Sequence, residues 1–152
     1  MSTQESYDGL EALDPFFALM HSALSPVADG EHYLDMLADD VVFDYPFAAP
    51  TGPRVIEGKQ TFIAYLGGYG SRLNLDAMSD LVVHQTSGQG VIILEYASHG
   101  SGVKTGQPYN NHYISVVTIR DRKIVHWRDY WNLLAVIAAV GDLTPVLEQL
   151  KA

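Results

Sequence analysis

Hydrophobic residues near the start of the chain recur at the spacing of an amphipathic helix. Side chains at i, i+3, i+4 and i+7 share one face, because a helix has 3.6 residues per turn. Asp14-Pro15 is typical of a helix start, with Asp as the N-cap and Pro at the first helical position, and Ser25-Pro26 is expected to end the helix. The predicted buried face holds Leu13, Phe16, Phe17, Met20 and Leu24.

Shorter elements are expected next. Proline cannot donate a ladder hydrogen bond, so Pro46 is expected to end a short strand, and the paired glycines 67–68 are expected to close a helix. The predicted order is a short helix from Asp29-Gly30 with Tyr33, Leu34 and Leu37 inward, a strand at 41–45, a loop at 48–55, and a helix at 57–66.

After Gly68 the hydrophobic period changes from 3.6 to 2, which is typical of half-buried strands. The links between the alternating runs are short and turn-like, and short links favour antiparallel neighbours. The predicted strands are 73–84, 91–99, 109–119 and 123–131, followed by a helix at 133–140 and a last helical turn that Thr144-Pro145 begins.

This order predicts an α+β fold in which the N-terminal helices cover one face of a strongly curved antiparallel sheet. Such an arrangement is a cone with one closed end, and a small ligand would bind in its hollow. The length of 152 residues suits one domain, expected over residues 10–152, with residues 1–9 as a flexible tail.

Charge and composition narrow the range of possible binding partners. The formal net charge is −9, which disfavours nucleic acid and anionic membrane surfaces as partners. The polar N-terminus lacks a signal peptide, no apolar run is long enough to span a membrane, and cysteine is absent. We therefore expect a cytoplasmic protein. Nine tyrosines indicate a lined cavity or an interface in addition to a core.

The sequence lacks the motifs of several common binding sites and reaction types. The six histidines show no metal-ligand spacing, so no metal is expected. The glycine-rich residues 100–106 have the wrong spacing for a dinucleotide loop and precede a strand, so we interpret them as a hairpin loop. No nucleophilic serine elbow is present.

The most informative chemistry lies in residues 127–132, Trp-Arg-Asp-Tyr-Trp-Asn. Side chains alternate along a strand, so Trp127, Asp129 and Trp131 share one face. If that face is buried, the pKa of Asp129 should rise, and a carboxyl that titrates near neutral pH suits acid–base catalysis. The alternative is a buried structural acid whose charge is satisfied by the main chain or by arginine.

The same alternation groups other polar and aromatic residues that we assign to the face of Asp129, although it does not fix which face points inward. Asn111 or a tyrosine hydroxyl there could donate a hydrogen bond to an oxyanion that forms during the reaction. The candidate substrate-binding residues are Phe43, Tyr45, Tyr96, Ser98, Asn111, Tyr113, Trp127 and Trp131.

Together with the order of elements, residues 37–46 and the Trp-Arg-Asp-Tyr-Trp-Asn ending resemble the nuclear transport factor 2-like superfamily over roughly residues 10–141. Within it the chain is similar to the SnoaL-like branch of small cyclases and isomerases. The resemblance implies an α+β cone and a homodimer packed through the sheet.

Three enzyme groups of this superfamily can be compared position by position. Limonene epoxide hydrolase-like enzymes have a catalytic carboxylate at the position of Asp129, but their other catalytic positions fall here at Tyr96, Ser98, Phe43 and Tyr45. Ketosteroid isomerases place their base at the position of Tyr45. Phenazine-biosynthesis isomerase-like proteins resemble residues 111–114 and carry an acid at the position of Asp129.

Three hypotheses follow. The first is a cofactor-independent isomerase or cyclase in which Asp129 moves a proton on a small apolar or aromatic substrate, Asn111 or a tyrosine steadies the charge, and aromatic rings enclose the substrate. The second is a non-catalytic binding or interaction protein on the same fold. The third is an atypical epoxide hydrolase that uses Asp129 with Tyr45 or Tyr96.

Overall fold

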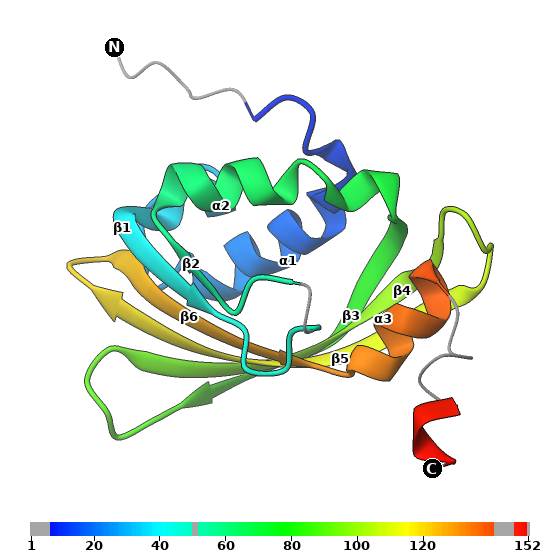
Figure 1. Ribbon diagram of the computed structural model, residues 1–152. Coiled ribbons are helices and arrows are strands. Elements are labelled where there is room, and N and C mark those ends of the chain that lie inside the picture. The colour runs from blue at the N-terminus through cyan, green and yellow to red at the C-terminus, as the bar shows by residue number, and fades with distance from the viewer. Residues whose placement is uncertain (1–6, 50–51, 142–147, 152) are drawn as a thin grey trace.

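The computed structural model describes residues 7–49, 52–141 and 148–151. A curved sheet forms one layer, and helices cover its concave face (Figure 1). The helices are α1 (Asp14–Leu24), α2 (Lys59–Leu66) and α3 (Leu133–Val140), with short 3₁₀ helices η1 (Glu11–Leu13), η2 (Tyr33–Met36) and η3 (Tyr69–Ser71). The strands are β1 (Leu37–Asp44), β2 (Val55–Glu57), β3 (Leu73–Gln85), β4 (Val91–Gly102), β5 (Pro108–Arg120) and β6 (Lys123–Trp131).

The strand order is β2-β1-β6-β5-β4-β3, so the sheet stays open at both ends. Strands β3 to β6 form the expected antiparallel meander. Strand β1 pairs with β6 in parallel, placing Phe43 beside Trp127. The predicted α+β class with helices on a curved sheet is confirmed, and this parallel pair is a feature that short-range patterns do not contain.

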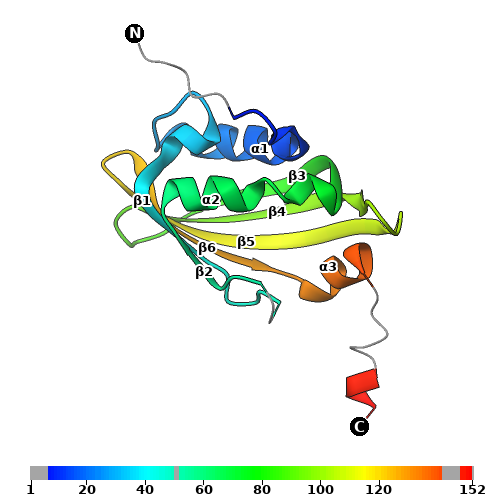
Figure 2. The same ribbon diagram turned by 45° about the horizontal axis from the view of Figure 1, so that its top comes forward.

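The core lies between the helices and the concave face (Figure 2). Phe17, Met20 and Leu24 of α1 are buried there, as their helical spacing predicts. From α2, Phe62 stacks on Phe43 with ring centroids 3.6 Å apart. Helix α2 therefore packs on β1, next to β6, and helix α1 packs on the edge strand β3.

The predicted boundaries differ from the structure mainly between residues 29 and 59. The short helix begins at Tyr33 rather than at residues 29–30, because the His32 side chain and Asp35 form a reciprocal capping box there. Leu37 belongs to β1 instead of the helix. The loop predicted at 48–55 runs into the three-residue strand β2, and α2 starts two residues later than expected, at Lys59.

The predictions for the two ends of the chain can be compared with the structure only in part. Residues 1–6 of the expected tail and the turn predicted at Thr144-Pro145 lie outside the described residues. Tyr7 is partly buried, its hydroxyl donates a hydrogen bond to Asp35, and its ring lies 4.7 Å from that of His32. The ordered fold therefore begins before residue 10.

Strand β3 contains an irregularity that helps the sheet curve. The pairing register between β3 and β4 shifts between Ser79 and Val82, and Asp80 takes a positive φ of 58°. A bulge of this kind bends a strand and increases its twist.

Candidate functional site

A cavity of about 200 Å³ lies between the concave face and the helices. Its wall is mostly aromatic, which suits a small apolar ligand. The described residues that line it come from η1, α1, η2, α2, η3, α3 and every strand except β2. Of the predicted site residues, it is lined by Phe43, Tyr45, Tyr96, Ser98, Tyr113, Trp127, Asp129 and Trp131.

Asp129 sits on the concave face because β6 alternates and the helices cover that side. The register of β5 and β6 places Ser115 directly across from it. Ser115 Oγ donates a hydrogen bond of 2.7 Å to Asp129 Oδ1, and the Tyr96 hydroxyl lies 3.5 Å from the same oxygen. The hydroxyl oxygens of Tyr96 and Ser115 are themselves 2.7 Å apart. The carboxyl is thus held by two hydroxyls from two neighbouring strands.

Burial raises the pKa of Asp129 from its ordinary value of 3.8 to about 7. The cause is the loss of water around the carboxylate, which disfavours the charged form. Hydrogen bonds from Ser115, Tyr96 and Trp127 oppose the rise, since they stabilise the charged form. Protein atoms enclose the group, yet the residue keeps some exposed surface because it lines the cavity. Asp129 can therefore both accept and release a proton near neutral pH.

Asn111 does not line the cavity. Its buried amide nitrogen donates to the Tyr109 hydroxyl at 3.1 Å and to the Asn132 carbonyl at 3.2 Å. Its side-chain oxygen accepts from the amides of His112 at 2.8 Å and Asn132 at 3.0 Å. These bonds fully occupy the side chain, so it holds the end of β6 instead of binding a ligand.

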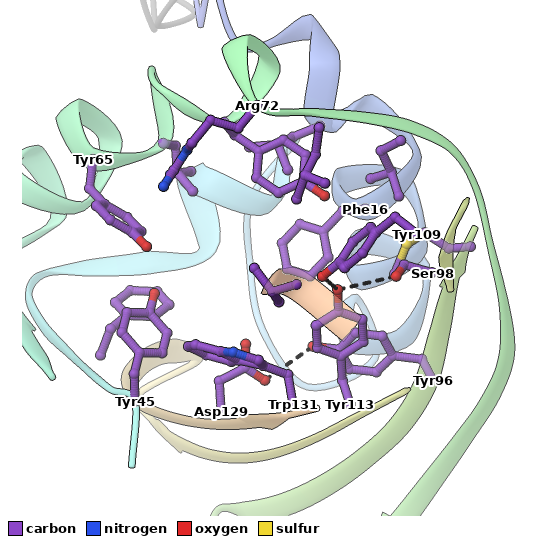
Figure 3. A pocket seen from close by; sticks show the side chains of 18 of the residues that line it. Phe16, Tyr45, Tyr65, Arg72, Tyr96, Ser98, Tyr109, Tyr113, Asp129 and Trp131 are labelled. Carbon is purple, nitrogen blue, oxygen red and sulfur yellow. Dashed lines mark hydrogen bonds between the residues drawn. The ribbon is translucent and has the colours of Figure 1, made fainter. Parts of the chain in front are cut away.

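A second polar chain runs along the cavity wall from Asn111. The Tyr109 hydroxyl contacts the Tyr113 hydroxyl at 2.6 Å, and Tyr113 contacts Ser98 Oγ at 3.1 Å (Figure 3). Tyr113 also stacks on Tyr96, with ring centroids 5.1 Å apart. The hydroxyls of Tyr96 and Tyr113 therefore already form hydrogen bonds with other residues of the protein.

Two tyrosine hydroxyls differ from this pattern. No described residue forms a hydrogen bond with the Tyr45 hydroxyl, although its ring packs 5.1 Å from that of Trp131. The Tyr33 hydroxyl is fully buried and also has no partner among the described residues. Burial raises the pKa of both hydroxyls well above 10, so both remain protonated. Tyr45 is the better placed donor, because the Tyr33 oxygen has no accessible surface.

The sequence alone did not identify several residues that line the cavity or that hold Asp129 from behind its wall. Ser115 and Tyr109 could have been found, because they lie two residues from Tyr113 and Asn111 on the same strand face. Tyr69 lies in η3 and Arg72 directly follows it, in a short stretch where no periodic signal marks an inward side chain. Tyr33 looked like an ordinary core residue.

The described residues contain no group of three or more His, Asp or Glu that could hold a metal ion. No helix in the described ranges is long and apolar enough to cross a membrane.

Sequence comparison finds relatives of similar length. The profile of the SnoaL-like domain matches residues 16–127. The uncharacterized protein YesE of Bacillus subtilis is 32% identical over 141 residues, which cover 93% of this chain and 92% of that protein. An uncharacterized PhzA/B-like protein of Pseudomonas aeruginosa is 31% identical over 128 residues, covering 82% and 89% of the two chains.

Solved structures share the fold. A Bacillus subtilis protein provisionally named an isomerase superposes with a TM-score of 0.69 at 29% identity, covering 90% of this chain and 95% of that one. A nuclear transport factor 2-like protein of Burkholderia xenovorans gives 0.62 at 16% identity, covering 91% and 100%. The latter likeness concerns the fold alone.

Proposed function

Because the chain belongs to the SnoaL-like domain family, we propose that it is a small acid–base enzyme of the isomerase or cyclase type. Its substrate is a hydrophobic small molecule held in the cavity. The same fold hosts many activities, so the proposal depends on the site and not on the fold. The provisional name of the Bacillus subtilis relative agrees with one of the two reaction types.

The observation that carries the proposal is Asp129 in an aromatic cavity with a pKa of about 7. A base is most effective when its pKa lies near the working pH, since it must accept a proton and then give it back. An acid that served the fold alone would be expected to have a cationic partner, and no salt bridge involving Asp129 occurs among the described residues.

The reaction would begin with Asp129 removing a proton from a carbon next to a substrate carbonyl. The free Tyr45 hydroxyl would donate a hydrogen bond to the enolate oxygen as negative charge builds there. In an isomerase the protonated Asp129 returns the proton to a different carbon. In a cyclase the enolate carbon attacks a second carbonyl, whose C=O π bond opens to an alkoxide, and the protonated Asp129 gives its proton to that alkoxide. Only protons move to and from the protein, so the reaction needs no cofactor.

A deuterium-exchange assay tests proton abstraction without knowledge of the product. Ring ketones that stabilise the protein against heat would be incubated with it in heavy water, and exchange of their α-protons followed by NMR. Asp129→Asn should slow exchange by about 100-fold or more, the range expected for loss of a general base. Asp44→Asn removes a carboxyl from the opposite face and should leave the rate unchanged. Exchange that survives in the Asp129 variant would refute the proposal.

The alternative functions lead to different results. A binding protein would retain its ligands in the Asp129→Asn variant and would exchange no protons. An epoxide hydrolase is favoured by a single contact, the Tyr96 hydroxyl near Asp129 Oδ1. Incubation with a panel of small epoxides would then yield diols, and Tyr96→Phe would abolish them.

A homodimer packed through the outer face of the sheet is part of the proposal, as is a location in the cytoplasm. Cross-strand neighbours form one row there, with Val82, Glu95, Ile114 and Tyr130 on β3 to β6. Val82 is 47% exposed and Ile114 44%. Apolar side chains grouped on an open sheet face are typical of an interaction surface.

A further inference from the structure

One basic side chain lines the cavity. Among the described lining residues Arg72 is the single cation and Asp129 the single carboxyl. The chain as a whole carries a formal net charge of −9, so a cation at a ligand cavity stands out against its surroundings. In an aromatic wall, a lone charged group is the kind of feature that orients a ligand.

The main chain of Arg72 is held in place, whereas its side chain is not engaged. Its amide donates to the Tyr69 carbonyl at 3.0 Å, and its carbonyl accepts from the Val103 amide at 2.9 Å. The residue is exposed, and no described residue forms a hydrogen bond or an ion pair with its guanidinium. Figure 3 shows Arg72 across the cavity from Asp129 and Trp131.

A neighbouring hydroxyl adds a second donor to this wall. Tyr69 lies three residues before Arg72 and also lines the cavity. Burial raises the pKa of Tyr69, and the positive charge of Arg72 partly opposes that rise, so the guanidinium lies close enough to act on the hydroxyl. An anion at this wall would meet a guanidinium and a phenol together.

We propose that Arg72 binds the carboxylate of the substrate, which is a monoanionic organic acid with one or two rings. This inference rests on the acid–base function proposed above, because it places the acid group at one wall and the reacting carbon at Asp129. A guanidinium matches a carboxylate through two parallel N–H···O bonds. A single cation balances one negative charge, which disfavours a phosphate dianion or a diacid.

The size of the cavity agrees with this class. An apolar cavity of about 150 Å³ accommodates benzene, and drug-sized ligands occupy about 300–1,000 Å³. The value of about 200 Å³ found here lies just above the lower figure. Contacts between the rings of such a ligand and an aromatic wall have little directional preference. A charged group at one end of the ligand therefore sets its orientation in the cavity.

Binding of naphthalene-2-carboxylate and naphthalene-2-carboxamide tests the inference, because the two probes differ in charge but hardly in shape. Titrations would follow tryptophan fluorescence and calorimetry at about pH 6, where Asp129 is mostly neutral and repels the acid little. The acid should bind about tenfold or more tightly than the amide, as expected for a charge-assisted pair. Arg72→Gln should remove that difference and leave amide binding unchanged, and Arg72→Lys should retain part of it.

Arg120→Gln is the matched control, since Arg120 is exposed at the end of β5 and does not line the cavity. It should bind both probes as the wild type does. Equal affinity for acid and amide, no measurable binding of the acid, or an equal loss in the Arg120 variant would overturn the inference. Tighter binding of 2-naphthyl phosphate would overturn the monoanion class.

The two proposals can fail separately. Asp129→Asn should bind the acid at least as tightly as the wild type, because it lacks a negative charge. If deuterium exchange were insensitive to Asp129 while acid binding still required Arg72, the enzyme proposal would fail and the anion site would stand. The opposite pattern would refute the anion site alone.

Discussion

The two faces of the sheet carry similar residue types in different surroundings. On the outer face, Glu95 contacts His84 at 2.5 Å and Asp44 contacts His126 at 3.1 Å, and both acids are more than a third exposed. On the concave face, Asp129 has hydroxyl partners and a wall of aromatic rings. The rings around Asp129 exclude water from its carboxyl, and this loss of water disfavours the charged form. The comparison shows that the face, more than the residue type, makes Asp129 chemically useful.

The largest expected difference between the faces concerns stability. Trp127 is 1% exposed, lies against Phe43 and Tyr33, and should cost about 3–5 kcal/mol when changed to alanine. Tyr130 lies on the opposite face of the same strand beside Phe47. Its change to alanine should cost at most about 1 kcal/mol. Urea unfolding gives both values, and equal losses would show that the two faces are packed alike.

Asp129 should also make stability depend on pH. Its folded pKa lies above its unfolded value, so the folded state retains a proton that the unfolded chain releases between pH 3.8 and about 7. Stability should therefore fall as pH rises through that window, by roughly 4 kcal/mol in total.

Asp129→Asn should remove this slope, so the variant should exceed the wild type in stability at about pH 8 and differ little at about pH 4. Asp44→Asn on the outer face is the control and should preserve the slope. Urea unfolding across this pH range provides the test. A wild type whose stability is flat between these pH values would contradict the raised pKa.

A substitution on the outer face of the sheet tests the proposed dimer directly. Ile114→Glu puts a second acid beside Glu95, its cross-strand neighbour, and like charges opposite each other are destabilising. Sedimentation should then show monomers of 16.7 kDa where the wild type shows dimers. Val103→Glu, in the loop after β4, has nearly the same exposure and should leave the dimer intact. A monomeric wild type would refute this part of the proposal.

The smallest expected effects on stability distinguish two tyrosines that line the cavity, Tyr96 and Tyr33. Tyr96→Phe removes hydrogen bonds to Ser115 and Asp129 and should cost about 1 kcal/mol. It should also raise the pKa of Asp129 further, because a stabiliser of the carboxylate is lost. Tyr33→Phe removes a buried hydroxyl that has no hydrogen-bond partner among the described residues, and it should be neutral or stabilising by up to about 1 kcal/mol. Chemical denaturation checks both, and a destabilising Tyr33→Phe would reveal a partner for that hydroxyl.

Local patterns alone determined several features of this protein. Strand β6 and helix α3 have the predicted bounds, and the alternation correctly grouped Trp127, Asp129 and Trp131 on one face. These features could be predicted because strand and helix periods depend on neighbours a few residues away. The resemblance to SnoaL-like domains was also present in short motifs, and the family comparison confirms it.

Only the tertiary structure decided what surrounds Asp129. The register of β5 against β6 brings Ser115 to it, and the parallel pairing of β1 brings Phe43 beside Trp127. Asn111 fitted the expected face but forms its hydrogen bonds with neighbours such as Asn132, while Arg72 reaches the cavity from the residue between η3 and β3. Such contacts join residues far apart in the chain, and a periodic pattern holds no information on distances between separate elements. The sequence could therefore point to the acid and to residues on its strand face, but not to the contacts that hold the acid or to the cation opposite.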